Sequence, residues 1–144
     1  MEISQLTAVD TASAKDINAL LAQLSSSGTA DERSIEFLQS VLANPTTEVW
    51  VAKEGGSIVG MASLALVVVP QHVVARVEDV VVDDSQRGKG LGKILSEKII
   101  ERAKARGAST LYLTSKPARE AANALYQKLG FEQYETNSYK MKLQ

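Results

Sequence analysis

Three glycines at alternate positions constrain this sequence more than any other feature, because they separate a β-branched run from a helical one. The stretch reads Gln86-Arg87-Gly88-Lys89-Gly90-Leu91-Gly92-Lys93 and follows Val80-Val81-Val82. Glycine lets the backbone curl and lets a ligand approach without a Cβ in the way. The unpaired amides and the positive dipole end at the start of a helix favour an anion, and the interleaved Arg and Lys add positive charge. The stretch therefore predicts a site for a phosphate or diphosphate group.

Spacing distinguishes this loop from two familiar nucleotide loops. The dinucleotide fingerprint G-x-G-x-x-G requires a glycine at position 93, which is Lys93. The triphosphate loop G-x-x-x-x-G-K-[ST] fails because Gly88 and Gly92 lie one residue too close, and because Ile94 stands where a hydroxyl would bind magnesium. Both mismatches weaken the hypothesis of a dehydrogenase or a kinase.

Hydrophobic periodicity predicts the element order β-α-α-β-β-β-α-β-α-β. Capping-box patterns at Ser13-x-x-Asp16 and Thr29-x-x-Glu32 open the first two helices, and Asn44-Pro45 ends the second. Glu54-Gly55-Gly56 predicts a tight hairpin. The expected strands are 2–9, 47–53, 57–69, 73–82, 109–114 and two segments within 131–143; the later helices are 90–106 and 118–129.

This order predicts one α/β domain over residues 1–144, with helices packed on a mixed sheet. A chain of 144 residues is long enough to bury its own core. Strand 73–82, helix 90–106 and strand 109–114 form a right-handed crossover, so the two strands are expected to be parallel. Ligands of such sheets bind beyond the carboxyl ends of the strands, which is where the glycine stretch lies.

Composition narrows the chemistry. Sixteen Lys and Arg against 17 Asp and Glu give a net charge of −1, which argues against a nucleic-acid binder. Without cysteine there is no disulfide, no thiolate metal site and no cysteine-bound acyl intermediate, and one histidine makes no metal cage, so no metal is expected. The first residues lack signal-peptide character and no run approaches the roughly 18 apolar residues of a membrane span, so a cytoplasmic protein away from the membrane is expected.

Two motifs resemble signatures of the GNAT family of N-acetyltransferases. Arg87-x-x-Gly90-x-Gly92 is similar to the R/Q-x-x-G-x-G/A loop that carries the diphosphate of acyl-coenzyme A in that family. Leu125-Tyr126-Gln127-Lys128-Leu129-Gly130-Phe131 resembles the family's tyrosine helix before its last strands. A simple turn needs one glycine rather than three between basic residues. The resemblance is good over residues 77–131 and elsewhere rests on element order.

The resemblance implies a GNAT fold, a mostly antiparallel sheet whose parallel fourth and fifth strands splay apart, with helices on both faces. It implies acetyl-CoA as co-substrate and a primary amine of a small molecule or peptide as acceptor, and a homodimer is common in the family. Backbone groups freed by a bulge would bind the pantetheine arm at Val80, Val81 and Val82. The implied diphosphate contacts are Arg87, Gly88, Lys89, Gly90, Leu91, Gly92 and Lys93.

Three further residues are candidates for the chemistry. Tyr126 resembles the family's general acid, which gives a proton to the departing thiolate, although a packed tyrosine would look the same in the sequence. Glu78 is the candidate general base for the acceptor ammonium, and its alternative is an ion pair with Arg76. Asn123 would hydrogen-bond the pantetheine or only surface water, since many family members carry asparagine where this chain has Arg119.

Alternation along the strand places Glu78 with Val80 and Val82, and Asp79 on the other face, unless a bulge shifts the phase. The residues 77–83 are similar to the same strand of glucosamine-phosphate acetyltransferases, but residues 113–117 lack the acidic segment of those enzymes, so that substrate does not transfer. Amino sugars, polyamines, amino-acid derivatives and peptide N-termini all stay open as acceptors.

The function expected from the resemblance is acetyl transfer by direct attack of the amine within a ternary complex. The alternative is a catalytically silent acyl-CoA-binding sensor or interaction module on the same fold. Replacing Tyr126 distinguishes the two hypotheses, because only an enzyme needs the phenol.

Overall fold

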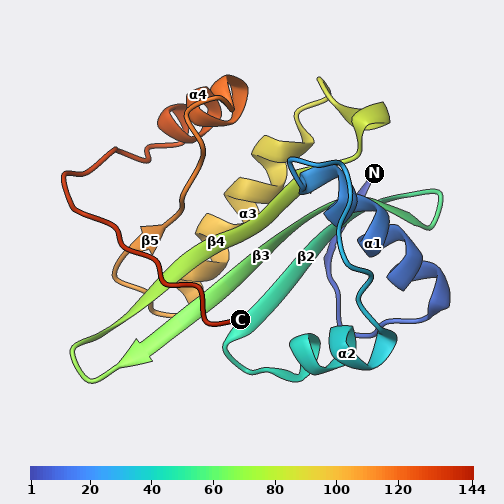
Figure 1. Ribbon diagram of the computed structural model, residues 1–144, viewed down its shortest axis with the longest axis horizontal. Coiled ribbons are helices and arrows are strands. Elements are labelled where there is room, and N and C mark those ends of the chain that lie inside the picture. Colours follow the sequence, from blue (N-terminus) through green and yellow to red (C-terminus); the bar gives the residue numbers. More distant parts are fainter. The chain divides into compact units, whose positions relative to one another are not determined.

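The computed structural model describes residues 1–144, which form two compact units, Met1–Thr114 and Ser115–Gln144. The first unit contains one five-stranded sheet in the order β1-β2-β3-β4-β5 (Figure 1). All neighbours pair antiparallel except β4 and β5, which are parallel as the crossover predicted. The strands are β1 (Glu2–Gln5), β2 (Thr47–Glu54), β3 (Ser57–Val69), β4 (His72–Val82) and β5 (Leu111–Tyr112).

Helices cover both faces of this sheet, which confirms the predicted α/β class. Residues of α1 (Thr11–Leu24) and α2 (Ile35–Ala43) share a buried core with Met61 of β3 and Val81 of β4. On the other face α3 (Leu91–Ala105) lies so close that a Cβ on Gly60 would come 3.2 Å from Leu95 Cδ1. Because alternate residues of β3 point to opposite faces, the sheet is filled on both sides.

The first two helices begin at other residues than the capping patterns predicted. Asp10, not Ser13, caps α1: Asp10 Oδ1 accepts a hydrogen bond from the Ser13 amide at 2.8 Å, and Ser13 Oγ accepts one from the Asp10 amide at 2.9 Å. Ser34 caps α2 by accepting from the Phe37 amide at 3.1 Å, so no helix starts at Thr29. The cap of α1 thus lies three residues before the predicted one and the cap of α2 five residues after it, because several polar residues compete for the cap near each helix start.

The hairpin between β2 and β3 and the loops on either side of α3 follow the predictions closely. The hairpin between β2 and β3 turns through Gly55 and Gly56, both with positive φ. A short 3₁₀ turn, Asp84–Gln86, follows β4, and α3 begins after Gly90 and stops before Gly107. None of the helices combines the length and hydropathy of a bilayer span.

The second unit contains α4 (Glu120–Lys128) and no strand. The two strand segments predicted within 131–143 are wrong, since residues 131–144 form neither helix nor strand. Alternating apolar residues make a strand only where a sheet edge takes up their backbone hydrogen bonds, and here Tyr139, Met141 and Leu143 are exposed. The predicted strand 109–114 is likewise reduced to the two residues of β5.

Candidate functional site

An irregularity in β4 creates the central feature of the site. The register pairs Met61 with Val81 and Ser63 with Glu78, so an interval of two residues in β3 lies opposite an interval of three residues in β4. The extra residue is a β-bulge at Asp79 and Val80, and Asp79 takes a φ of 51°, the one positive φ outside glycine. The bulge shifts the alternation, which is the exception that the sequence left open: Glu78 is in phase with Val81 and not with Val80 and Val82.

The bulge also leaves part of β4 open towards β5. Strand β5 pairs only with Ala75 and Arg76 of β4, so the two strands have no ladder beyond Arg76. The Asp83 amide donates to the Val59 carbonyl of β3 at 2.8 Å, and alternation then turns the main chain of Val80 and Val82 away from β3. Free main-chain groups at a strand edge accept a ligand that offers hydrogen bonds of its own.

The glycine stretch lies directly beyond this open strand. Gly88 and Gly90 have φ values of 81° and 80°, and an added Cβ at either position would meet no atom within 4 Å. Gly90 is the N-cap of α3 and offers no side-chain acceptor, so the first amides of the helix keep their hydrogen-bonding capacity. A helix start that has no side-chain cap and has open space beside its glycines can accommodate an anionic group such as a diphosphate.

The basic side chains of the loop are exposed and hold only local partners. Arg87 pairs with Asp84 at 2.9 Å, and Lys89 donates to the side chain of Gln86 at 3.0 Å. Lys93 lies 4.0 Å from Glu97, one turn further along α3. Exposed pairs of this kind contribute about 0 to 1 kcal/mol each, so an incoming phosphate group competes with them at small cost.

Helix α1 fixes the start of the loop. Gln23 Nε2 donates to Asp83 Oδ1 at 2.7 Å, while Gln23 Oε1 accepts from the Asp84 amide at 3.0 Å. The hydrogen bonds from Gln23 and Ser85 lower the pKa of Asp83, which therefore stays ionised as the cap of the 3₁₀ turn. Gln23 could not be predicted from the sequence, because no pattern identifies the partner of a polar residue on a helix surface.

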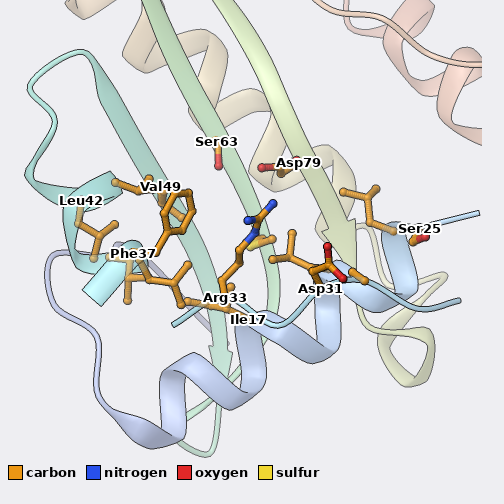
Figure 2. Close-up of a pocket in the computed structure, with 16 residues that line it drawn as sticks. Ile17, Ser25, Asp31, Arg33, Phe37, Leu42, Val49, Ser63 and Asp79 are labelled. Atoms are coloured by element: carbon orange, nitrogen blue, oxygen red, sulfur yellow. The ribbon is translucent and has the colours of Figure 1, made fainter. Parts of the chain in front are cut away.

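A cavity of about 480 Å³ lies on the α1 and α2 side of the sheet (Figure 2). Three charged side chains, Asp31, Arg33 and Asp79, line it together with Ser63. The rest of the wall is mainly apolar, including Ile17, Leu21, Phe37, Leu38, Val49 and Met61. Predominantly apolar walls with few charged groups are typical of small-molecule sites of this size.

Asp79 joins this cavity to the bulge. The sequence placed Asp79 on the face opposite the candidate base, yet the bulge brings its side chain to the cavity wall. Asp79 remains exposed to solvent, but partial desolvation by the surrounding chain, and then repulsion from Glu78, raise the pKa of its carboxyl above its usual value. A carboxyl with a perturbed pKa in a cavity is a candidate functional group. Only the bulge could have revealed it, and the sequence does not show where the register shifts.

Glu78 lies on the same face as the cavity but is not among its lining residues. Its pairing with Ser63, which does line the cavity, sets that face. Glu78 Oε1 accepts a hydrogen bond from Arg76 Nε at 2.9 Å, so the ion pair that was the structural alternative is present. About half of the Glu78 side chain stays exposed (45%), which leaves a path for protons through water.

The other two candidates lie in the second unit. Tyr126 is half-buried on α4 and its ring contacts Phe131 edge-on, 5.8 Å between centroids. Burial raises the pKa of the phenol above 10, and the charge of Arg119 offsets this only in part. Asn123 Nδ2 donates to the carbonyls of Lys116 and Arg119 at 2.9 and 2.8 Å, so its amide fixes the turn before α4. Its Oδ1 is the atom left for a ligand.

A strand opened by a bulge, followed by a helix start without a side-chain cap, is an arrangement suited to an extended ligand with a phosphorylated end. Comparison with known sequences gives the family. The family model described as "Acetyltransferase (GNAT) family" matches residues 15–131, and the chain belongs to that family. The predicted resemblance and fold class are thereby confirmed.

Relatives and solved structures agree with this assignment. Glucosamine 6-phosphate N-acetyltransferase of Trypanosoma brucei brucei is 38% identical over 98 residues, which is 65% of this chain and 63% of that protein. An uncharacterised N-acetyltransferase of Escherichia coli is 29% identical over 72% of this chain and 62% of its own length. The chain thus spans less than two thirds of either relative.

Among solved structures, an acetyltransferase of Trypanosoma brucei superposes with a TM-score of 0.78 at 27% identity, over 99% of both chains. An aminoglycoside acetyltransferase from a soil metagenome superposes with a TM-score of 0.80 over 99% of this chain and 98% of its own. Its identity of 22% shows a shared fold only.

Proposed function

We propose that this protein transfers an acetyl group from acetyl-CoA to a primary amine of a small molecule or peptide. The observation that carries the proposal is the continuity of the open β4 edge with the uncapped start of α3. Main-chain groups at Val80 and Val82, with Val81 between them, bind the pantetheine arm. The amides and basic side chains at residues 87–93 bind the diphosphate.

The chemistry requires a neutral amine beside the thioester. The acceptor arrives as an ammonium and first loses one proton; its nitrogen then forms the C–N bond while the C–S bond breaks. The nitrogen loses a second proton, and the departing thiolate takes one up, so one acetyl amide, one thiol and one free proton result. We place the attack of the amine directly on the thioester within a ternary complex, since the chain has no cysteine to carry the acetyl group.

Two side chains are assigned to the proton transfers. Glu78 takes the ammonium proton, directly or through water, since its half-exposed carboxylate lies on the cavity face of β4. Tyr126 gives a proton to the thiolate, and a raised pKa suits that role because the phenol stays protonated up to alkaline pH. Asn123 would add a contact to the pantetheine through Oδ1.

The glycine loop is tested with a matched pair of variants. Gly90 and Gly107 flank α3, share a φ near 80° and have open space where a side chain would grow. Both glutamate variants should therefore lose similar stability, roughly 1 to 2 kcal/mol for the left-handed backbone. Only Gly90→Glu should abolish acetyl-CoA binding in calorimetry, because its carboxylate repels the diphosphate. Equal binding by both variants would contradict the assigned loop.

Tyr126→Phe separates an enzyme from a silent binding module. We expect kcat to fall about 10- to 1000-fold, while the dissociation constant of acetyl-CoA changes less than about twofold. Tyr139→Phe is the control, because it removes the same hydroxyl from an exposed tyrosine. Thiol release from acetyl-CoA across a panel of amines gives the measurement. Unchanged turnover in Tyr126→Phe would remove the phenol from the mechanism, and absence of turnover with tight acetyl-CoA binding would favour the module.

A further inference from the structure

The cavity beside the bulge carries both signs of charge on an otherwise apolar wall. Asp79 lies at its β4 side, and Asp31 and Arg33 lie on the segment between α1 and α2. Figure 2 shows the guanidinium of Arg33 extending into the cavity on the side of Ser63 and Asp79. A polyamine would need several carboxylates and no cation, and a neutral sugar would need more hydroxyl and amide groups than this wall offers.

Arg33 is held in place although it has no salt-bridge partner. Asn18 of α1 clamps its backbone: Asn18 Oδ1 accepts from the Arg33 amide at 2.8 Å, and Asn18 Nδ2 donates to the Arg33 carbonyl at 3.0 Å. The guanidinium lies over the ring of Phe37, 5.1 Å from its centroid. No ion pair of the structure includes Arg33. A positioned guanidinium without an anion is ready to bind a carboxylate in a two-pronged hydrogen bond.

Asp79 supplies the complementary group for the amine. Its carboxylate lines the same cavity and belongs to the bulge that opens the main chain of Val80 to the thioester arm. An ammonium bound at Asp79 would therefore lie next to the acetyl group. It would also relieve the raised pKa of Asp79, because an opposite charge favours the ionised carboxylate.

We propose that the acceptor is a free amino acid with an apolar side chain, whose ammonium binds Asp79 and whose carboxylate binds Arg33. Its side chain lies against the apolar wall formed by Phe37, Leu38 and Leu42. This inference rests on the proposed acetyl transfer and adds the class of acceptor to it. Asp79 orients the amine, and Glu78 remains the group that takes the proton.

The test compares L-leucine with leucinamide, which keeps the amine and the side chain but lacks the carboxylate. Wild-type protein should prefer leucine in kcat/KM by about 10- to 100-fold, the value of one charge-assisted contact. Arg33→Gln should lose that factor for leucine, chiefly through KM, and change leucinamide by less than about threefold. Lys15→Gln removes an exposed cation of α1 outside the cavity and should alter neither substrate.

Asp79→Asn is the second arm, and it should weaken both substrates because both carry the amine. Asparagine also tolerates the left-handed backbone at this position, so the variant is expected to fold. Glucosamine 6-phosphate has an amine and an anion without an apolar portion, and it should be a poorer acceptor than leucine.

Calorimetry keeps this inference separate from the proposed function. Binding of leucine to wild-type protein, and its loss in Arg33→Gln, would support the cavity assignment even if no acetyl transfer were found. Failure of acetyl-CoA to bind would instead overturn the proposed function. Equal use of leucine and leucinamide, equal loss of both in Arg33→Gln, or preference for glucosamine 6-phosphate would overturn the assigned acceptor.

Discussion

At the scale of single residues, Asp79 combines two costs that a purely structural residue avoids. Its φ of 51° is a left-handed conformation that side chains other than glycine, asparagine and aspartate rarely adopt. Partial desolvation of this exposed side chain and the neighbouring Glu78 also raise the pKa of its carboxyl. Strained backbone and disfavoured charge at one position are typical of functional sites, where stability is given up for chemistry.

Asp79→Asn should therefore stabilise the fold at neutral pH. A raised pKa means that the folded protein binds the Asp79 proton more tightly than the unfolded chain does. Stability is then lost as pH rises from the ordinary value of 3.8 through the raised folded pKa. Thermal denaturation should give a higher Tm for the variant at pH 7 and nearly equal values at pH 3. The exposed Asp84→Asn should show no such difference, and a lower Tm for Asp79→Asn at pH 7 would contradict the account.

At the scale of elements, one buried carboxylate ties β2 to α3. Glu48 is only 3% exposed and accepts hydrogen bonds from Arg102 at 2.8 Å, Arg106 at 2.6 Å and the Trp50 indole at 2.9 Å. Burial alone would raise the pKa of Glu48, but these donors outweigh it and lower the pKa to about 2. Removing one partner of such a cluster strands the others without compensation.

The lowered pKa of Glu48 predicts a specific loss of stability in acid. Its contribution is complete above the ordinary value of 4.5 and disappears as pH falls through the folded value of about 2. The difference amounts to roughly 3 kcal/mol at most. In Glu48→Gln, urea denaturation should show a lower stability at pH 7 and a flatter decline between pH 5 and 2. An equally steep decline in this variant would assign the acid sensitivity to other groups, and Glu97→Gln serves as the exposed control.

Turns could be predicted because local sequence determines them. Helix caps and strand register were harder to predict, because they depend on which residues or strands pair. The glycines at 55, 56, 90 and 107 mark turns in the sequence and take positive φ in the structure. The helix caps shifted to Asp10 and Ser34, because several polar residues compete near each helix start. The register of β4 could not be predicted from the sequence. The position of the bulge at Asp79 is set by pairing with β3, and no feature of the valine run indicates it.

The candidate site divides in the same way. The glycine loop could be predicted from the residues, because glycine spacing is a local property, whereas the opening of β4 was implied only by the family resemblance. Arg33, Asn18 and Asp79 could not, since a cavity formed by distant segments leaves no common pattern in any of them. The class of acceptor can therefore be inferred only from the cavity that α1 and α2 form with the sheet, and not from the sequence.

At the scale of the whole molecule, the first unit carries nearly everything that the proposal needs. The open edge of β4, the glycine loop and the cavity all belong to residues 1–114. Tyr126 and Asn123 belong to residues 115–144, where no side chain is fully buried. The proposal of a single catalytic domain over residues 1–144 therefore includes Tyr126 of the second unit.

A crystal structure of the protein grown with coenzyme A would show whether the open edge of β4 and the start of α3 hold this ligand. We expect the diphosphate on the amides of residues 88–93 and the pantetheine arm hydrogen-bonded to the main chain of Val80 and Val82. The sulfur should lie at the bulge, beside the Asp79 cavity. Coenzyme A bound at any other surface would contradict this proposal. A gap between β4 and β5 that stays empty at saturating ligand would contradict it as well.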